Sequence, residues 1–422
     1  MKVYKFGGAS VKNADGVRNL RTIIDDEQQL FIIVSAMGKT TNALERVFAA
    51  ARQHDPQAAQ AEIDQIRANH TLIIEELWHG PKQLERVEAL FADLEAFVAA
   101  DNFVDADAEM WYDRIVAYGE LVSTTIISEY LNYAGVPNTW IDMRQAMRTE
   151  QRHKDAEVDL EASTPLLKAA VSGAKNSIFV GQGFIGGAPD GTTTTLGREG
   201  SDYSAAVVAN ILDAESMAVW KDVDGVLNAD PKIFKDAVKI DALNYLDTIE
   251  LAYSGAQIIH PKTIKPLQNK NIPLYVRPFG DKSKPGTMIC GEVEHATMPI
   301  MIYKRDQVLL VIRSKDFSFV MEEKFGVVFQ LLDQYRIKTH LIHNSAVDLG
   351  LCVDSSWHID ELIKALEEEG FQVEKHDNVS LLTIRNYTDE VYARYIKGRR
   401  HIVRQVNPES VRVVMREEDF SK

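Results

Sequence analysis

A glycine- and threonine-rich stretch over residues 184–204 constrains this chain more than any other part of its sequence. It reads FIGGAPDGTTTTLGREGSDYS, with glycines around four consecutive threonines, followed by Arg198 and Asp202. Glycine lets the backbone adopt positive φ, and successive amides in such turns form concave anion sites. A helical pattern begins after Gly200 and places Ser201 and Asp202 at a helix N-terminus, where an anion is favoured. The stretch therefore predicts a phosphate or carboxylate site rather than a mobile hairpin loop.

The composition excludes several classes of protein. At 422 residues the chain is long enough for two or three domains, and its net charge of −15 argues against a nucleic-acid surface. Cys290 and Cys352 lack metal-type spacing, so we expect neither a disulfide framework nor a cysteine metal site. The start MKVYKFGG lacks the apolar core of a signal peptide, and no apolar run approaches the ~20 residues of a membrane span. We therefore expect a cytoplasmic protein without a membrane partner.

The first two thirds of the chain predict alternating strands and helices. Strands are predicted over residues 3–6, 30–34, 176–180, 217–220 and 272–276, with a helix over 16–25 and long amphipathic helices over about 43–100. This alternation predicts a mostly parallel sheet with helices on both faces. Lys5 with its following glycines, and Lys221 with Asp222, come at strand ends, where ligands gather in open α/β sheets.

Two nucleotide-binding patterns occur without the context that they need. Gly-Lys-Thr at 38–40 resembles the end of a P-loop, but Ile33 stands where the first glycine is required. Residues 181–186 match G-x-G-x-x-G, yet turn residues follow instead of a helix. We therefore reject a Walker-type site and a nicotinamide site. Asn42, three residues before Glu45, predicts a helix N-cap.

A different pattern begins after residue 286, and a new unit starts near residue 298. Strands are predicted over 307–313, 339–344, 346–355, 371–374 and 379–385, with helices over 325–332 and 359–369. This is the β-α-β-β-α-β order of a ferredoxin-like fold. Residues 387–422 predict one further helix and a strand over 410–415.

Five segments together resemble the aspartokinases within the amino-acid kinase family. They are KFGGAS at 5–10, TTTTLGREGSD at 192–202, WKDVDG at 220–225, YSGAQIIHP at 253–261 and the segment from RPF at 277 to PGT at 287. Ala9 and Glu199 depart from the threonine and glycine of the family pattern. The tail is similar to ACT regulatory modules. The resemblance implies an amino-acid kinase catalytic domain over 1–293 and an ACT-like domain of ferredoxin-like α+β fold over 294–422, in which the second ACT unit is shortened.

The family reaction that this resemblance implies transfers the ATP γ-phosphoryl group to the β-carboxylate of L-aspartate, the first step toward lysine, threonine and methionine. A carboxylate is already ionised at neutral pH, so catalysis depends on alignment and neutralisation of negative charge. ATP and L-aspartate are the implied substrates, with Mg²⁺ held mainly by the nucleotide and no metal site built from protein ligands. Paired ACT modules imply a homodimer. An amino-acid effector stays open, because His340 stands where lysine-binding members keep an acidic residue.

Matching positions assign roles to individual residues. Lys5 would neutralise the transferring phosphate, with Gly8 and Asp202 as the other catalytic residues. Arg198 would hold the α-carboxylate as a bidentate fork that lysine cannot copy. Glu120 would bind the substrate ammonium, although a lone glutamate beside an apolar stripe predicts a solvated surface. The substrate-binding set is Thr41, Glu120, Arg198 and Ser201, and the nucleotide-binding set is Lys5, Gly7, Gly8, Ser10, Ser35, Lys221, Asp222 and Lys232.

Two alternatives remain at this stage. The chain could be another amino-acid kinase that acts on glutamate, acetylglutamate or a nucleoside monophosphate. It could also be a catalytically weak amino-acid sensor in which the ACT-like tail is the functional part. Glu199, Gln257 in place of a common family lysine, and the shortened tail favour the sensor.

Overall fold

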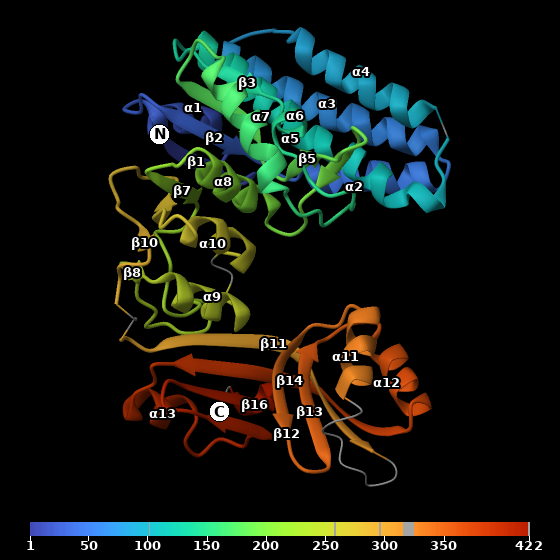
Figure 1. Ribbon diagram of the computed structural model, residues 1–422, viewed down its shortest axis with the longest axis vertical. Helices are drawn as coiled ribbons and strands as arrows, with labels where there is room; N and C mark the ends of the chain where they lie inside the picture. Colours follow the sequence, from blue (N-terminus) through green and yellow to red (C-terminus); the bar gives the residue numbers. More distant parts are fainter. Residues whose placement is uncertain (101, 257–258, 295–296, 315–324, 421–422) are drawn as a thin grey trace. The chain divides into compact units, whose positions relative to one another are not determined.

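The computed structural model describes residues 1–100, 102–256, 259–294, 297–314 and 325–420 (Figure 1). By its internal contacts the chain divides into two compact units. The first contains Met1–Val226, Ile240–Thr248 and Ile259–Glu294, and the second contains Leu227–Lys239, Ile249–Ile258 and the chain from residue 295 onward. Two short segments of the predicted catalytic domain therefore pack with the second unit, and the domain boundary at residue 293 stays a prediction.

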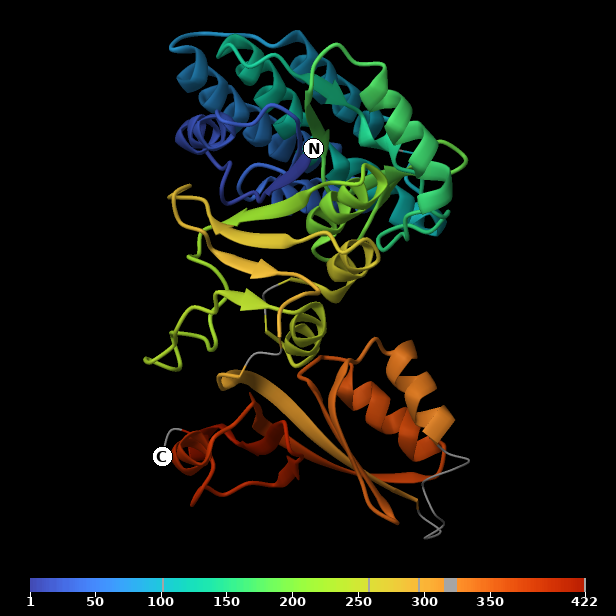
Figure 2. The same ribbon diagram turned by 60° about the vertical axis from the view of Figure 1, so that its left-hand side comes forward.

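An eight-stranded sheet forms the centre of the first unit, in the order β3-β4-β2-β1-β7-β9-β10-β8. Neighbouring strands run parallel, except that β10 runs antiparallel to β9. Figure 2 shows β7 in green beside β9 and β10 in gold. This arrangement confirms the predicted mostly parallel sheet. The strands are β1 (Lys2–Phe6), β2 (Leu30–Val34), β3 (Thr139–Ile141), β4 (Ile178–Gln182), β7 (Ser216–Lys221), β8 (Ala242–Leu243), β9 (Leu274–Pro278) and β10 (Thr287–Ile289).

Helices cover both faces of this sheet. Tyr4 and Phe6 of β1 join a core with the helices from α1 to α5, whereas α8 packs against β1, β2 and β7. Because side chains alternate along a strand, Lys5 lies on the face opposite Tyr4 and Phe6. The helices of this unit are α1 (Ala14–Ile24), α2 (Thr40–Arg52), α3 (Pro56–Trp78), α4 (Glu85–Ala99), η1 (Asp105–Asp107), α5 (Ala108–Tyr133), α6 (Met143–Ala146), α7 (Leu160–Ser172), α8 (Gly200–Ile211) and α10 (Pro261–Gln268), and α9 (Tyr245–Tyr253) extends into the second unit.

The predicted N-cap at Asn42 is wrong. Helix α2 begins at Thr40 after Lys39, whose side chain makes no capping hydrogen bond. The chain reverses earlier than the capping pattern indicates, because Gly38 adopts a φ of +58° and its amide donates to the carbonyl of Gly8 over 3.0 Å. A contact with the loop after β1 therefore decides where the helix starts.

The threonine tract forms a strand, not part of an anion-binding loop. Strands β5 (Ile185–Gly187) and β6 (Thr193–Thr195) pair as an antiparallel hairpin, so a hairpin and not a helix follows the G-x-G-x-x-G pattern. Thr194 and Thr195 are buried, and their hydroxyls pair with Thr149 over 2.8 Å and with Asp113 over 2.5 Å. Their hydroxyls are therefore engaged within the protein.

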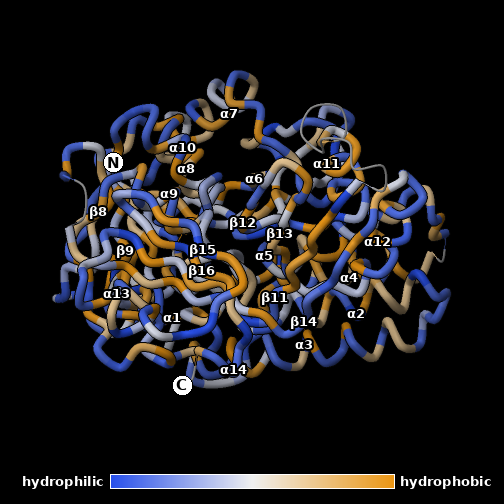
Figure 3. The backbone as a smooth tube through the Cα atoms, turned by 90° about the horizontal axis from the view of Figure 1, so that it is seen from below, coloured by the Kyte–Doolittle hydropathy of each residue, from blue (hydrophilic) through white to orange (hydrophobic). Residues whose placement is uncertain are grey.

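The second unit is built on a six-stranded antiparallel sheet in the order β12-β13-β11-β14-β16-β15. The ferredoxin-like order of its first six elements confirms the predicted fold class, and the apolar stretches of its strands can be followed in Figure 3. Its elements are β11 (Ile300–Ser314), α11 (Phe325–Gln334), β12 (Thr339–Asn344), β13 (Asp348–Asp354), α12 (Ile359–Glu368), β14 (Phe371–Arg385), α13 (Asp389–Tyr395), β15 (Val403–Val406), β16 (Ser410–Arg416) and α14 (Glu417–Phe420).

Strands β14 and β15 of this sheet differ from the sequence prediction. The predicted strands at 371–374 and 379–385 are one continuous strand, β14, because its pairing with β11 continues through register shifts near Gln307. Strand β15 was not predicted; its residues alternate between half-buried and exposed at the edge of the sheet. Both cysteines are free thiols. None of the helices in the described ranges is long and apolar enough to cross a membrane.

Candidate active site

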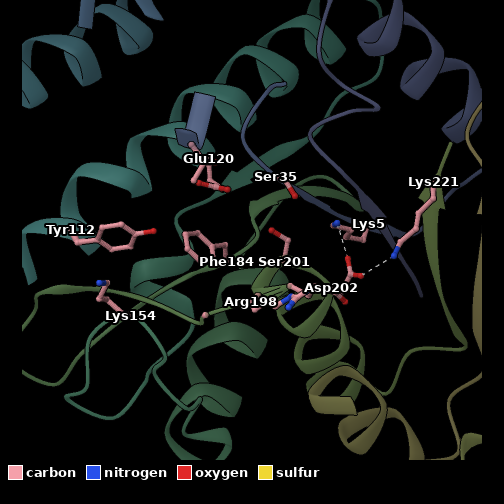
Figure 4. A pocket seen from close by; sticks show the side chains of 14 residues that line it. Lys5, Ser35, Tyr112, Glu120, Lys154, Phe184, Arg198, Ser201, Asp202 and Lys221 are labelled. Carbon is pink, nitrogen blue, oxygen red and sulfur yellow. Dashed lines mark ion pairs between the residues drawn. The ribbon is translucent and has the colours of Figure 1, made fainter. Parts of the chain in front are cut away.

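A cavity of about 520 Å³ lies at the carboxyl ends of β1, β2 and β7 (Figure 4). It is bounded by the loops that follow these strands, by α5 and by the first turn of α8. Because carboxyl ends of parallel strands meet at one edge, segments far apart in the sequence converge here. Its lining residues are Lys5, Ser35, Thr41, Tyr112, Glu120, Lys154, Phe184, Gly197, Arg198, Glu199, Gly200, Ser201, Asp202 and Lys221.

One end of the cavity, here called the basic end, consists of Lys5, Asp202 and Lys221. Lys5 Nζ lies 2.7 Å from Asp202 Oδ1, and Lys221 Nζ lies 3.6 Å from Oδ2 of the same carboxylate. Burial alone would raise the pKa of Asp202, but the two lysines together hold this pKa below its ordinary value. The carboxylate is therefore ionised, and the three side chains carry a net positive charge that attracts an anion.

The glycines after β1 bring two loops into backbone contact beside the basic end. A Cβ atom on Gly8 would lie only 2.4 Å from the carbonyl oxygen of Ala36, in the loop after β2. A Cβ atom on Gly7 would lie 3.6 Å from Lys5 Nζ, so this residue borders the ammonium. Because glycine has no side chain, the loop after β1 can approach the loop after β2 at Gly8, and the backbone of Gly7 stays accessible next to Lys5.

Glu120 contributes a buried carboxylate to the middle of the cavity. It is 3% exposed, because α5 is covered on nearly all sides, so the surface expectation from its periodicity is wrong. Its Oε1 accepts from the amide of Ala36 over 3.1 Å, whereas Oε2 is buried without a hydrogen-bond partner in the described residues. Burial raises the pKa of Glu120 to about 8, against the opposing Ala36 hydrogen bond and the charge of Lys5. A cationic ligand group would satisfy Oε2 and favour the ionised form.

Arg198 and Ser201 flank the first turn of α8. In the part of the chain that the structure describes, the exposed guanidinium of Arg198 pairs with no carboxylate. Ser201 approaches the end of β4 closely, since a Cβ atom on Gly183 would lie 2.5 Å from the Cβ atom of Ser201. Figure 4 shows Arg198 and Ser201 between the basic end and the opposite end of the cavity. An unpaired cation and a buried, half-satisfied carboxylate therefore line the same space.

A second cavity of about 740 Å³ adjoins the first, and Lys221 lines both. It contains two further residues of the predicted nucleotide-binding set, Ser10 and Asp222. Its lining residues are Ala9, Ser10, Lys12, Asn13, Asp15, Gly16, Asn19, Lys221, Asp222, Val223, Asp224, Pro278, Phe279, Gly280, Asp281 and Lys284. The space next to the basic end is thus large enough to receive an elongated ligand.

Other predicted residues lie elsewhere, and some lining residues were not predicted. Lys232 belongs to the second unit and lines neither cavity, and Gln257 lies outside the described residues. Tyr112, Lys154 and Phe184 line the first cavity and were not predicted as site residues. Phe184 lies in the glycine-rich stretch, at a φ of +69°, so its position there was the one available hint.

The structure also accounts for Glu199, which departs from the family pattern. Glu199 precedes α8 at a φ of +54°, a conformation that favours glycine. Its Oε2 accepts from the amide of His260 over 3.0 Å, at the residue that caps the N-terminus of α10. The carboxylate of Glu199 therefore lies at the positive N-terminal end of α10, which stabilises its negative charge beside the anion site.

Comparison with known proteins agrees with this architecture. A family model described as "Amino acid kinase family" matches residues 1–278, and the chain belongs to that family. Lysine-sensitive aspartokinase 3 of Escherichia coli is 32% identical over 361 residues, which cover 84% of this chain and 78% of that protein. Within the amino acid kinase family the chain belongs to the aspartokinases, so it is an ATP-dependent kinase, as the sequence motifs predicted.

Solved structures extend the likeness over both units. The crystal structure of E. coli aspartokinase III in complex with aspartate and ADP has a TM-score of 0.82 at 27% identity, and the match covers 99% of this chain and 97% of that one. The structure of the same enzyme in complex with lysine and aspartate has a TM-score of 0.79 at 27% identity, covering 100% of this chain and 97% of that one. These matches confirm the predicted fold class.

Proposed function

We propose that the chain transfers the γ-phosphoryl group of ATP to the β-carboxylate of L-aspartate, giving 4-phospho-L-aspartate and ADP. A β-carboxylate oxygen forms the new bond to the γ-phosphorus, and the bond between this phosphorus and the β,γ-bridging oxygen breaks. The negative charge that leaves with the bridging oxygen stays on ADP. No proton has to move, since the attacking carboxylate is already ionised at neutral pH.

The single observation that carries this proposal is that Oε2 of Glu120 has no hydrogen-bond partner among the described residues, in a cavity that also holds Arg198. An α-amino acid presents an ammonium and a carboxylate on one carbon, and these two protein groups are their complements. A buried carboxylate oxygen without a partner costs free energy that a bound ammonium would recover. Thr41 and Ser201, which line the same cavity, supply hydroxyls to the substrate.

The basic end supports the phosphoryl-transfer half of the reaction. Two anions must approach each other, so the energetic task is to neutralise and align them. Lys5 is proposed to contact the transferring phosphoryl group, with the backbone of Gly7 and Gly8 beside it. Asp202 holds Lys5 and Lys221 together through its two oxygens and so fixes where the positive charge lies.

The nucleotide is proposed to extend from the basic end into the second cavity, past Ser10 and Asp222. Mg²⁺ is proposed to arrive with the nucleotide and to offset the charge of its phosphate oxygens. Asp202 does not fit the role of a metal ligand, because both of its oxygens already face lysine ammonium groups. Its part in the reaction is to orient these two cations.

The proposal is tested by measuring ADP release with L-aspartate, L-glutamate, N-acetyl-L-glutamate and UMP as acceptors, with hydroxylamine present to trap acyl phosphates. We expect ADP and hydroxamate in equal amounts with L-aspartate, and slower turnover with the other acceptors. Faster turnover with another acceptor would show a different amino-acid kinase. Amino-acid binding without turnover would support the sensor alternative.

Regulation and assembly are further parts of the proposal. His340, on β12, lies 2.7 Å from Asp354 and 2.8 Å from Lys304, so this buried histidine is engaged within the second unit. Adding lysine or threonine to the same assay tests whether either one acts as an effector. Light scattering on the purified chain tests the predicted homodimer. The cytoplasmic location stays a prediction.

A further inference from the structure

Lys154 and Tyr112 form the end of the first cavity that lies opposite the basic end (Figure 4). Lys154 Nζ lies 4.8 Å from the centroid of the Tyr112 ring, a cation–π contact. Within the described residues no carboxylate pairs with this ammonium. The cavity therefore has a second cation besides Arg198 that lacks an anionic partner.

The backbone of Lys154 is held in a conformation that lysine disfavours. Its φ of +67° lies in the left-handed region, where a Cβ atom is crowded. The conformation is maintained by Asp113, whose two carboxylate oxygens accept from the Lys154 amide over 3.1 and 3.0 Å. Asp113 is fully buried, accepts from the Thr195 hydroxyl, and has Oδ2 2.9 Å from His153 Nδ1. A rigid acceptor on α5 thus fixes the loop that carries the lysine.

Tyr112, the residue before Asp113, is fixed as well. Its hydroxyl donates to Glu45 Oε1 over 2.9 Å, and its ring packs edge-to-face on Phe48 with centroids 5.5 Å apart. Two consecutive residues of α5 therefore support Lys154: Asp113 binds its backbone amide, and the ring of Tyr112 contacts its ammonium. Such support is unusual for an exposed lysine, whose side chain is ordinarily solvated and mobile.

We propose that Lys154 is a specificity-determining residue whose ammonium neutralises the α-carboxylate of the amino-acid substrate together with Arg198. The inference rests on the proposed function and follows by elimination. The reacting β-carboxylate has to face the basic end, and the substrate ammonium has to face Glu120 and would be repelled by Lys154. The α-carboxylate is the one remaining charged group, and it attracts a cation at this end of the cavity. Asp113 is a positioning residue that acts through Lys154.

The test compares L-aspartate with its α-amide, which keeps the reacting β-carboxylate and the ammonium but lacks the α-carboxylate charge. The ratio of kcat/KM for the two substrates is measured in the unchanged protein, in Lys154→Met and in Lys154→Gly. We expect this ratio to fall about tenfold in both variants, because one contact between opposite charges is lost. The loss should come from a raised KM for L-aspartate, with the KM for ATP and the turnover of the α-amide unchanged.

Controls separate this role from a structural one. Lys154→Gly relieves the positive φ and should not lower Tm, and Lys154→Arg should retain most of the discrimination because it keeps the charge. Lys175→Met removes an equally exposed lysine that does not line the cavity, and it should leave the ratio unchanged. Asp113→Asn should raise the KM for L-aspartate with little change in kcat.

The outcomes distinguish the inference from the proposed function. An active unchanged protein whose ratio does not respond to Lys154→Met or Lys154→Gly would overturn the inference alone. Equal losses for both substrates would overturn it too, because they would show a role unrelated to the α-carboxylate. Absence of aspartate-dependent turnover in the unchanged protein would overturn the proposed function and the inference with it.

Discussion

The Lys5 ammonium lies 2.7 Å from Oδ1 of Asp202, so an ion pair joins the central strand β1 to the first turn of α8. Both residues are nearly buried, at 9% and 2% exposure. A buried pair of this kind is costly to break on one side, because the remaining charge is left in a poorly solvated place. Lys221 is a second cation beside Asp202. We therefore expect the protein to fold without the Lys5 ammonium, although the proposed phosphoryl transfer requires it.

Replacing Lys5 should abolish turnover while the protein still folds. Lys5→Met keeps the length of the side chain and leaves Asp202 paired with Lys221. We expect kcat to fall on the order of 10³-fold, since the charge proposed to stabilise the transferring phosphoryl group is lost. Steady-state ADP release and a thermal unfolding curve measure the two effects. The matched control is Lys2→Met on the same strand, where the lysine pairs with Glu27 and should be dispensable. Near-normal turnover in Lys5→Met would contradict the proposed phosphate path.

Arg198→Lys should weaken the binding of aspartate selectively. The planar guanidinium can hold a carboxylate through two parallel hydrogen bonds, which an ammonium cannot do. We expect the KM for aspartate to rise about tenfold or more, corresponding to roughly 1.4 kcal/mol, while the KM for ATP stays the same. Because Arg198 is exposed and unpaired in the described part of the chain, Tm should not change. A larger effect on the KM for ATP than for aspartate would assign Arg198 to the nucleotide instead.

The glycines at positions 7 and 8 should respond differently to the same substitution. Gly8→Ala would place a methyl group 2.4 Å from a backbone oxygen, so one of two packed loops has to move. We expect a loss of about 2 kcal/mol or more in the free energy of unfolding. Gly7→Ala meets only the end of Lys5, at 3.6 Å, and should fold normally while lowering kcat. Equal unfolding curves for the two variants would argue against the close contact of the loops after β1 and β2.

Several features of the fold were predictable from local patterns. The apolar run 30–34 matches strand β2 to the residue, since a strand buried on both faces is continuously apolar. The β-α-β-β-α-β order of the second unit also followed from periodicity, whereas the short strands β3, β8 and β10 of the first unit were not predicted. The cap at Asn42 failed because the competing signal, a turn at Gly38 held by Gly8, depends on a contact between two loops.

The site was predictable where the glycine-rich stretch, the strand ends or family motifs mark it. Periodicity placed Glu120 on the surface, because that argument assumes a helix with one solvated face, and α5 is covered on nearly all sides. No local pattern marked Lys154, since its place in the cavity depends on Asp113, which is 41 residues away in the sequence. A hydrogen bond between residues so far apart in the sequence leaves no local pattern. The roles assigned to individual residues stay predictions.

The buried carboxylate of Glu120 should make both stability and substrate affinity depend on pH. Burial raises its pKa from an ordinary value near 4.5 to about 8, so the folded state binds more protons than the unfolded state between these two values. Stability contributed by the neutral form is therefore present at low pH and is lost as pH rises from about 4.5 to 8. In Glu120→Gln this loss of stability does not occur, because the amide does not ionise. It should leave Tm nearly unchanged at pH 5 and raise the free energy of unfolding by up to about 4 kcal/mol at pH 8.

Affinity should change with pH in the opposite direction, because the substrate ammonium requires the ionised carboxylate. Below pH 8 we expect the KM for aspartate to fall by up to about tenfold for each unit of pH rise, whereas the KM for ATP stays level. In Glu120→Gln the KM for aspartate should be high and independent of pH over the same range. Initial rates from pH 6 to 8.5, with Asp93→Asn as a control for an exposed carboxylate, measure the slopes. A flat profile in the unchanged protein would mean that Glu120 does not receive the ammonium, and the orientation proposed for the substrate would then have to be reversed.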